Sequence, residues 1–391
     1  MSAFFLDWLN LLARWFHLVV GIGWIGASFY FVALDLELRK REKMRPGVYG
    51  TAWQVHGGGF YHVEKYLVAP DELPPDLIWY KWEAYLTWMS GFALLIIQYY
   101  ANARLFLIDP NVLDMTPGEA VVMSVATLLG GWLIYNRLCR SKLINYPAAL
   151  ALCVMALIIG AAYLYTHIFS ARGAFLHVGA FIGTIMAFNV FMVIIPNQRK
   201  VVASLIAGEQ PNPAYGREGK QRSLHNNYLT LPVLLMMLSN HYPFLTGHPQ
   251  GWLVVALVVV VGGSIRHFLN RTDAHDPFHK YSWTVPVAVV GLGILVYLTA
   301  PARTTSEGTV SDAQVMAIVD KHCVMCHAVK PTHAGIDAPP KDIAFTGPPA
   351  LIRYKPLIMA QAVQSQTMPL GNETGMTEAE RQELGEWLNA H

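Results

Sequence analysis

Long apolar blocks separated by short polar connections fill the first 300 residues of the chain. Eight blocks reach the length of about 20 residues that an α-helix needs to cross the hydrocarbon core of a bilayer. They span residues 8–35, 83–103, 117–137, 147–167, 174–196, 228–246, 250–269 and 281–300. We therefore predict an all-α fold for this part, a polytopic bundle of eight transmembrane helices with a lipid bilayer as its partner.

The remaining residues have the pattern of a small soluble all-α domain. Ser311 with Gln314 and Thr377 with Glu380 match the capping box that begins many helices. Apolar residues follow each pair at helical spacing: Val315, Ile318 and Val319, then Leu384, Trp387 and Leu388. We expect a membrane domain at 1–300, a linker at 301–310 and a separate domain at 311–391.

Composition and charge agree with a membrane protein. The chain is 54% hydrophobic and only 14% charged, which excludes an ordinary soluble enzyme of this length. Lys and Arg gather in the connections after the first, third, fifth and seventh blocks, whereas the opposite connections hold little beyond Arg104 and Arg172. The positive-inside rule then puts both termini outside, in the periplasm if the membrane is a bacterial inner membrane. Because the basic residues follow topology, nucleic-acid binding has no support.

Cys323, Cys326 and His327 form a C-x-x-C-H motif, the pattern that attaches a c-type haem. The two thiols bind the haem covalently and the histidine becomes an axial ligand of the iron. Met368, followed by Pro369, is placed to give the sixth ligand. A zinc or redox C-x-x-C would need further cysteines nearby, and this region has none. The motif predicts a class I cytochrome c domain, and haem attachment in the periplasm agrees with the predicted orientation.

Two details of the haem site stay open in the sequence. Met359 and Met376 are alternatives to Met368 as the axial ligand, although either can be a packing residue. The segment Gly347-Pro348-Pro349 offers a carbonyl that can orient the ring of His327.

The eight blocks also resemble one another as two sets of four. The first block carries His17-x5-Gly23, and the fifth carries His177-x5-Gly183 with further matches at the same offsets. A repeat of four spans returns the chain to its starting side. The two halves would therefore form a parallel 4+4 repeat, with function expected at their interface.

Four histidines fall near the outer side of the predicted membrane: His17, His167, His177 and His241. A histidine at a membrane boundary is often a satisfied interfacial residue, but one that faces a bundle is a candidate for function. We consider all four as candidate ligands of a b-type haem or a metal, and the repeat-related pair His17 and His177 as the best.

A second group of polar residues faces the predicted cytoplasmic side. His56, His62 and Glu64 lie in a long connection with three consecutive glycines, which allow a ligand to approach the backbone. His225, in the segment His225-Asn226-Asn227, ends another inner connection. We take these four as candidate catalytic residues, although the first connection can equally be an interfacial loop. His267, with Arg266 and Arg271 near it, can complete a cationic pocket for an organic anion.

A long inner connection with His56–Tyr66, a first block with His17 and Trp24-Ile25-Gly26, and a C-x-x-C-H domain occur here together. In these features the chain resembles the membrane-bound urate oxidase (urate hydroxylase) family of bacterial purine degradation, and the likeness covers the whole chain. The resemblance implies an oxidoreductase that converts urate to 5-hydroxyisourate and passes electrons to its fused c-type haem rather than to oxygen. It assigns no catalytic residue in the membrane part.

The resemblance leaves the electron path open. A urate site on the inner side would be separated from the haem by the hydrocarbon core of about 30 Å. That gap needs a relay, for which haem b at the outer histidines is a candidate, whereas urate bound on the outer side needs none. The electrons would leave to a soluble or membrane acceptor such as a cytochrome c or a terminal oxidase. Other interpretations are a non-catalytic subunit that relays electrons from quinol or a dehydrogenase, and a transporter.

Overall fold

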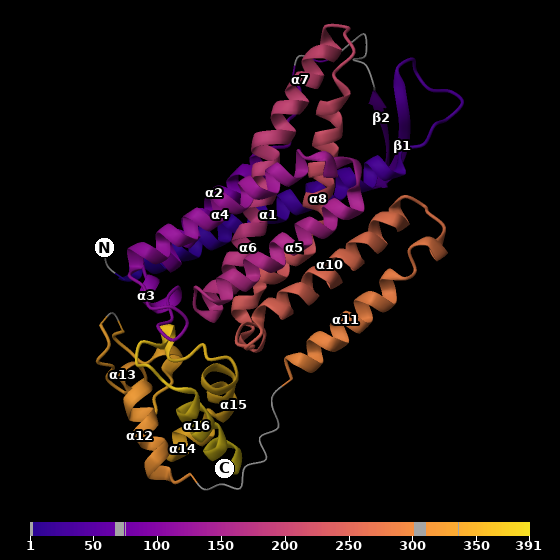
Figure 1. The fold of residues 1–391 in the computed structure, drawn as a ribbon. Helices are drawn as coiled ribbons and strands as arrows, with labels where there is room; N and C mark the ends of the chain where they lie inside the picture. Colours follow the sequence, from indigo (N-terminus) through magenta and orange to yellow (C-terminus); the bar gives the residue numbers. More distant parts are fainter. Residues whose placement is uncertain (1–2, 67–73, 75, 301–309, 335) are drawn as a thin grey trace.

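The computed structural model describes residues 3–66, 74, 76–300, 310–334 and 336–391 of the chain. Most of these residues are helical, and they form a long helix bundle with a smaller helical lobe at one end (Figure 1). The predicted linker, residues 301–310, lies outside the described residues apart from Val310. A hairpin and the helix α7 extend from the end of the bundle opposite the lobe (Figure 1).

The bundle is built from long helices in chain order. They are α1 (Ala3–Glu37), α2 (Trp82–Leu95), α4 (Pro117–Cys139), α5 (Pro147–Thr166), α6 (Ala171–Phe188), α7 (Ile195–Ile206), α8 (Pro213–Leu238), α10 (Gly251–Asp273) and α11 (Thr284–Leu298). A π-helical turn, η1 (Ile96–Tyr100), extends α2, and another, η3 (Asn189–Ile194), joins α6 to α7. Shorter elements complete the connections: α3 (Ala103–Phe106), η2 (Lys142–Asn145), η4 (Ser239–His241), α9 (Pro243–Thr246) and η5 (Phe278–Lys280).

Five helical segments are long and apolar enough to cross a membrane. They are Trp8–Glu37, Pro117–Cys139, Pro147–Thr166, Ala171–Ile206 and Gly251–Asp273. The other three predicted spans are also helical but do not meet this criterion. Helix α11 has only 15 residues, α2 ends in a π-helical turn, and α8 begins with a polar stretch. The number of eight spans stays a prediction.

The outer surface of the bundle is unusually apolar. Trp15, Leu18 and Ile22 of α1 are about two-thirds exposed, as is Val296 of α11. Large apolar side chains in such numbers are rare on the surface of soluble proteins. The interior holds a second apolar layer built around Tyr165, Phe169 and Phe181. The helices are therefore apolar on both sides, as expected for a bundle surrounded by lipid.

One element contradicts the predicted all-α fold. Strands β1 (Val48–His56) and β2 (Gly59–Tyr66) pair antiparallel within the first long connection, with His56 opposite Gly59. Gly57 and Gly58 form the two-residue turn, with φ of 60° and 80°. A tight hairpin turn of type I′ needs positive φ at both positions, which glycine adopts without strain. The turn therefore accounts for two of the three consecutive glycines, and no ligand is needed to explain them.

The lobe has the helices that the capping patterns predicted. Helix α12 (Asp312–His322) begins after Ser311 and α16 (Glu378–Ala390) after Thr377, and each has a complete capping box. Between them lie α13 (Val324–His327), η6 (Pro340–Asp342), α14 (Pro348–Arg353), α15 (Lys355–Ile358), η7 (Met359–Gln364) and η8 (Leu370–Asn372). The predicted apolar residues of α12 and α16 share one buried core with Leu351 and Ile358. The lobe therefore has a hydrophobic core of its own.

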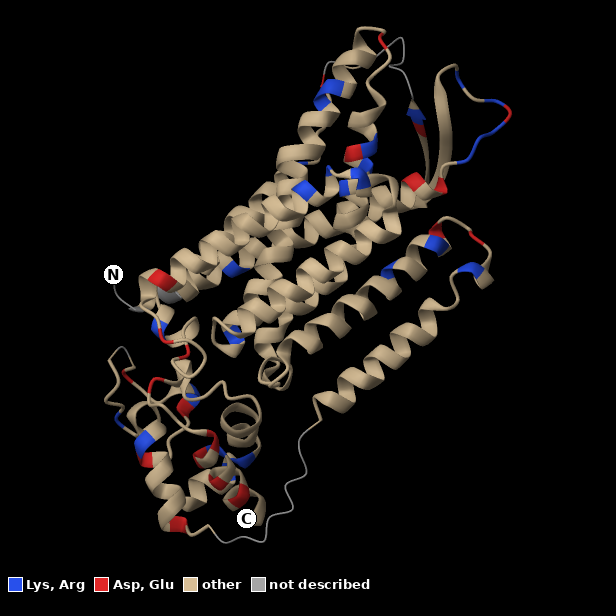
Figure 2. Ribbon diagram, in the orientation of Figure 1, with Lys and Arg blue, Asp and Glu red and all other residues tan. Residues whose placement is uncertain are grey.

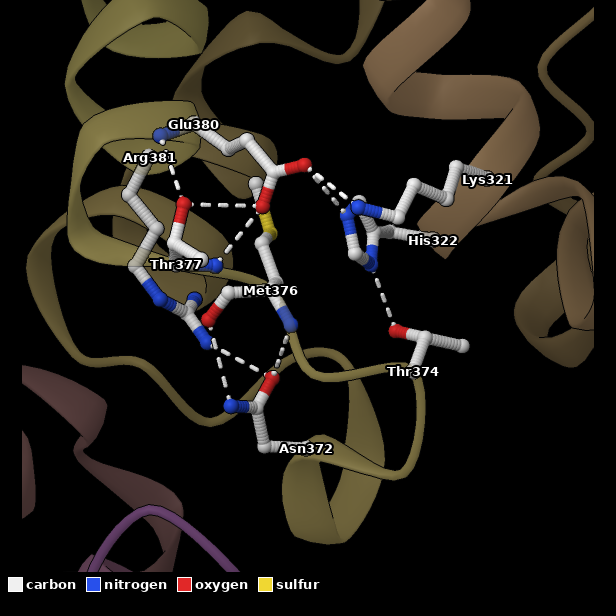
Figure 3. Close-up of polar contacts among 8 residues, drawn as sticks. All are labelled: Lys321, His322, Asn372, Thr374, Met376, Thr377, Glu380 and Arg381. Carbon is white, nitrogen blue, oxygen red and sulfur yellow. Dashed lines mark hydrogen bonds and ion pairs between the residues drawn. The ribbon is translucent and has the colours of Figure 1, made fainter.

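A polar network joins α12, α16 and the loop between η8 and α16 (Figure 3). Glu380 accepts hydrogen bonds from Lys321 Nζ at 2.8 Å and from the backbone amide of Thr377 at 2.8 Å. Its carboxylate also lies 3.1 Å from Nε2 of the buried His322, whose Nδ1 contacts Thr374 Oγ1 at 2.7 Å. These contacts connect the start of α16 to the end of α12, directly before the C-x-x-C-H motif.

Replacing Glu380 with Gln should destabilise the lobe at neutral pH but not in strong acid. The hydrogen bonds from Lys321 and the Thr377 amide lower the pKa of Glu380 from its ordinary value of 4.5. The ionised carboxylate therefore stabilises the lobe above that pH, and the contribution is lost as the pH falls through the lowered pKa. Thermal unfolding of both proteins across a pH series measures the difference. Glu383→Gln, an exposed position on the same helix, is the control, and a difference independent of pH would contradict the assignment.

Candidate functional site

The C-x-x-C-H motif forms a single turn between two helices of the lobe. The chain leaves α12 at His322, and the backbone amides of Cys326 and His327 donate to the carbonyl of Cys323 at 3.1 and 2.8 Å. This turn is α13, and both cysteines are partly exposed free thiols. The two sulfur atoms and the imidazole are therefore presented by one compact segment, as covalent haem attachment requires.

His327 is oriented by a backbone carbonyl, but not by the predicted one. Its Nδ1 donates to the carbonyl of Ile343 at 2.8 Å, and its ring lies beside Phe345. The prediction of a carbonyl from Gly347-Pro348-Pro349 was wrong, because the Gly347 carbonyl accepts from the Ala350 amide at the start of α14. A hydrogen bond at Nδ1 leaves Nε2 for a metal, the usual arrangement of histidine ligands. The residues therefore fit an axial haem ligand.

Met368 lies in a loop whose backbone is fixed on both sides. Its amide donates to the carbonyl of Gln361 at 2.8 Å, and its carbonyl accepts from Arg381 Nη1 at 2.7 Å. Met376 is buried in the core of the lobe and Met359 packs against that core. The axial role of Met368 stays a prediction.

Within the described residues, no three or more His, Cys, Asp or Glu side chains lie together in a group that could hold a metal ion. Attachment of a haem needs no such group, because the porphyrin supplies the equatorial ligands of the iron and the protein only the axial ones.

The lobe packs directly against the near end of the bundle. Gly371, with φ of 57°, lies so close to α3 that an added Cβ would be 2.1 Å from the Arg104 carbonyl oxygen. At Gly247, after α9, an added Cβ would be 1.9 Å from Ser365 Cα. A cavity of about 20 Å³ in this seam is lined by residues of both parts, including Thr367, which precedes Met368. The loop with the predicted axial methionine therefore faces the bundle.

His177 is the most deeply buried of the predicted outer histidines. Its Nδ1 donates to the carbonyl of Gly173 at 2.7 Å, and its Nε2 contacts Ser124 Oγ at 2.6 Å. Ser124 Oγ in turn contacts the Tyr100 hydroxyl at 2.7 Å, and the Phe169 ring lies 4.5 Å from the imidazole. The Nδ1 contact suits a metal ligand, but binding at Nε2 would have to replace the contact with Ser124.

The other three outer histidines do not join His177 through any hydrogen bond or ring contact that the structure gives them. His17 of α1 is partly buried, contacts Ser90 Oγ at 2.9 Å and lies against Gly91 of α2. His167 and His241 are exposed at the end of the bundle that faces the lobe. Only His17 and His177 therefore remain inside the bundle, on different helices. Their role as ligands of haem b stays a prediction.

At the opposite end of the bundle, α8 contributes buried polar side chains to a network with α4 and η3. Arg222 is fully buried and donates to Asn136 Oδ1 at 2.8 Å and Asn189 Oδ1 at 3.3 Å. Asn189 Nδ2 donates to the Tyr135 hydroxyl at 2.9 Å, and the same hydroxyl lies 2.8 Å from His225 Nδ1. The Tyr135 hydroxyl therefore connects His225 to the network of Arg222.

A second buried network lies between α8, α10 and α1. Asn227 Oδ1 accepts from Arg266 Nε at 2.9 Å and from Asn270 Nδ2 at 2.8 Å. The Arg266 guanidinium carbon lies 4.0 Å from the centroid of the Phe29 ring. The neighbouring His267 contacts the Tyr228 hydroxyl through Nδ1 at 2.7 Å.

Neither Arg222 nor Arg266 has an ion pair with a carboxylate in the described part of the chain. A guanidinium that is removed from water without an opposite charge is costly, so such sites commonly receive an anion. The sequence pointed to Arg266, His267, His225 and the two asparagines after it. It missed Asn189, Tyr135 and Asn270, whose only signal is a polar side chain within an apolar helix.

The structure separates His225 from the other three predicted catalytic residues, of which His62 and Glu64 lie together, with His62 Nδ1 3.9 Å from Glu64 Oε1. His56 ends β1 at the tip of the hairpin, and His62 and Glu64 lie on β2, which projects from the helices (Figure 1). His62 stacks on Trp53, and Glu64 accepts from the Tyr66 hydroxyl at 2.8 Å. Only His225 lies in a buried network. The catalytic role of all four stays a prediction.

Comparison with protein families matches residues 3–299 to the family described as "Urate oxidase N-terminal". No curated protein and no solved structure matches the chain. The matched segment contains the whole bundle, the hairpin and both buried arginine networks, and it ends before the lobe. The chain belongs to the urate oxidase N-terminal family.

Proposed function

We propose that the chain is a membrane-bound urate oxidase that converts urate to 5-hydroxyisourate and passes the electrons to a c-type haem on its own lobe. The observation that carries the proposal is the family match over residues 3–299, which includes two buried arginines without carboxylate partners. The C-x-x-C-H turn supplies the electron acceptor, since Cys323 and Cys326 would hold the haem and His327 presents its free Nε2.

The reaction requires two electron transfers. Urate monoanion and water give 5-hydroxyisourate, one proton and two electrons. A c-type haem takes one electron at a time, so an external acceptor, such as a soluble cytochrome c or a terminal oxidase, must reoxidise it between the transfers. The protein has to bind the flat anion, accept a proton and exclude competing oxidants. His225, which contacts the Tyr135 hydroxyl through Nδ1 at 2.8 Å, is a candidate for the proton acceptor.

The distribution of charge supports an orientation for the proposed enzyme. Lys and Arg gather at the end of the bundle with α7 and the hairpin, and few lie on the end near the lobe (Figure 2). By the positive-inside rule the α7 end would face the cytoplasm and the lobe the periplasm, where c-type haem is attached. An eight-span topology in a bacterial inner membrane satisfies both requirements.

The orientation places the arginine networks and the haem at opposite ends of the bundle. Electrons would have to cross about 30 Å of hydrocarbon. We propose that haem b ligated by His17 and His177 provides the intermediate step, because these two are the outer histidines that lie inside the bundle. Haem analysis of the purified protein decides this point: fully active protein with c-type haem alone would remove the relay.

Urate should reduce the c-type haem of the purified full chain without any other protein. Anaerobic addition of urate to oxidised protein, followed by absorption spectroscopy, measures haem reduction. Because the product requires loss of two electrons and the haem takes one, 5-hydroxyisourate is detected in a second reaction that contains an artificial acceptor such as ferricyanide. An electron-transfer subunit without urate chemistry would leave urate unchanged and its haem oxidised. That result would contradict the proposed function.

Met368→Leu should lower the reduction potential of the c-type haem and slow its reduction by urate. Loss of a thioether ligand removes the stabilisation of the reduced iron, while the cysteine attachments remain. Spectroelectrochemical titration gives the potential, and haem content confirms attachment. Met359→Leu and Met376→Leu are matched controls. A lowered potential in one of these, with Met368→Leu unchanged, would reassign the axial ligand.

Gly247→Ala should slow haem reduction by urate several-fold and leave reduction by ascorbate unchanged. The added Cβ would lie 1.9 Å from Ser365 Cα, so the lobe would have to move away from the bundle. A small soluble reductant reaches the haem from solvent and does not depend on the seam. Gly118→Ala is the control, because its added Cβ would have no neighbour within 4 Å. Equal rates of haem reduction by urate in the wild type, Gly247→Ala and Gly118→Ala would show that the seam does not support electron transfer.

A further inference from the structure

We propose that Arg266, Asn227 and Asn270 form the binding site for the urate monoanion, between α8 and α10. We call these three residues the Arg266 site. The inference rests on the proposed function and adds the location of the substrate and the residues that recognise it.

The Arg266 site leaves three polar atoms without partners. Asn227 Oδ1 is shared by Arg266 Nε and Asn270 Nδ2, which aligns the three side chains. Arg266 Nη2, Asn227 Nδ2 and Asn270 Oδ1 have no hydrogen-bond partner. The residues are only 3%, 0% and 0% exposed, so water does not readily replace the missing partners. Each such group costs about 1–3 kcal/mol when it stays unsatisfied.

The pattern of these atoms matches an oxopurine anion. Two donors and one acceptor are complementary to an edge with carbonyl oxygens and a ring N–H, and urate has such edges. The guanidinium adds the positive charge that the monoanion needs and is itself planar. The Phe29 ring covers one face of the guanidinium, with its centroid 4.0 Å from the guanidinium carbon, so an anion would meet the N–H edge of Arg266. Charge and hydrogen-bond pattern therefore point to the same ligand class.

Arg222 is a weaker candidate for the same role. Its Nη atoms already donate to Asn189 Oδ1, Asn136 Oδ1 and the Asn136 carbonyl, so oxygens surround its charge although its Nε has no partner. Arg266 donates to a single oxygen. The difference indicates that Arg222 supports the helix packing, whereas Arg266 remains available for an anion.

Urate binding to the full chain can be measured separately from its oxidation. Protein reduced beforehand with ascorbate cannot accept electrons, so isothermal titration calorimetry with urate reports the Kd alone. Arg266→Gln should raise the Kd by about tenfold or more, a loss of about 1.4 kcal/mol, and Arg266→Lys should give an intermediate value because it keeps the charge. Arg140→Gln removes an exposed arginine at the same end of the bundle and should leave the Kd unchanged.

Asn270→Asp separates anion binding from a purely structural role of Arg266. The change keeps the shape of the side chain but places a carboxylate next to the guanidinium. It should raise the Kd for urate by about tenfold or more, because the carboxylate compensates the guanidinium and repels the anion. The loss of the Asn270 Nδ2 donor to Asn227 Oδ1 is checked with Asn270→Ala, which removes the same bond without adding a charge and should raise the Kd less. Asn270→Asp also keeps the test valid if Arg266→Gln does not fold.

Two results have different meanings. Wild-type protein that neither binds nor oxidises urate would overturn the proposed function. Wild-type protein that binds urate, with unchanged Kd values in Arg266→Gln and Asn270→Asp, would overturn the Arg266 site alone.

Discussion

Burial of polar side chains inside an apolar bundle is the constraint on which the rest of this structure depends. Lipid offers no hydrogen bonds, so a polar group on a helix costs free energy unless it finds a partner inside the protein or in a bound ligand. Helix α8 illustrates the consequence, because Arg222 and Asn226 bond toward α4 and η3 while Asn227 bonds toward α10. These bonds fix α8 between its neighbours. They also concentrate two positive charges at one end of the bundle.

The same constraint separates the two arginines by function. A buried guanidinium whose charge is surrounded by amide and carbonyl oxygens contributes to the packing of the helices, whereas one with few acceptors stores a free-energy cost that an anion can remove. Arg222 of α8 donates to three oxygens through its Nη atoms and leaves only Nε without a partner. Arg266 of α10 donates to one oxygen through Nε and leaves Nη2 without a partner. Substrate binding at Arg266 would therefore complete a network that the protein leaves open, while Arg222 keeps the framework in place.

The sequence predicted those features that depend on local pattern. Both capping boxes of the lobe and all eight apolar blocks are helical, because caps and helix periodicity act over a few residues. The hairpin was missed, since its aromatic and polar residues lack a simple alternation and the glycines suggested a ligand. The sequence also could not predict which distant residues are hydrogen-bonded to each other. Ile343 instead of Gly347 orients His327, and Asn270 meets Asn227, because such contacts depend on how distant segments pack.

The proposed positions of substrate and haem have an energetic consequence. Urate at the Arg266 site would release its proton on the cytoplasmic side, and its electrons would move outward to the lobe. The inner face of an energised bacterial membrane is negative, so each electron that crosses gains about 2.3 kcal/mol per 100 mV. Electron transfer through an intermediate carrier, such as haem b between His17 and His177, would then run outward, in the direction that the membrane potential favours. The separation of anion site and lobe by the length of the bundle is thus compatible with rapid oxidation, provided that an intermediate carrier shortens the individual transfers.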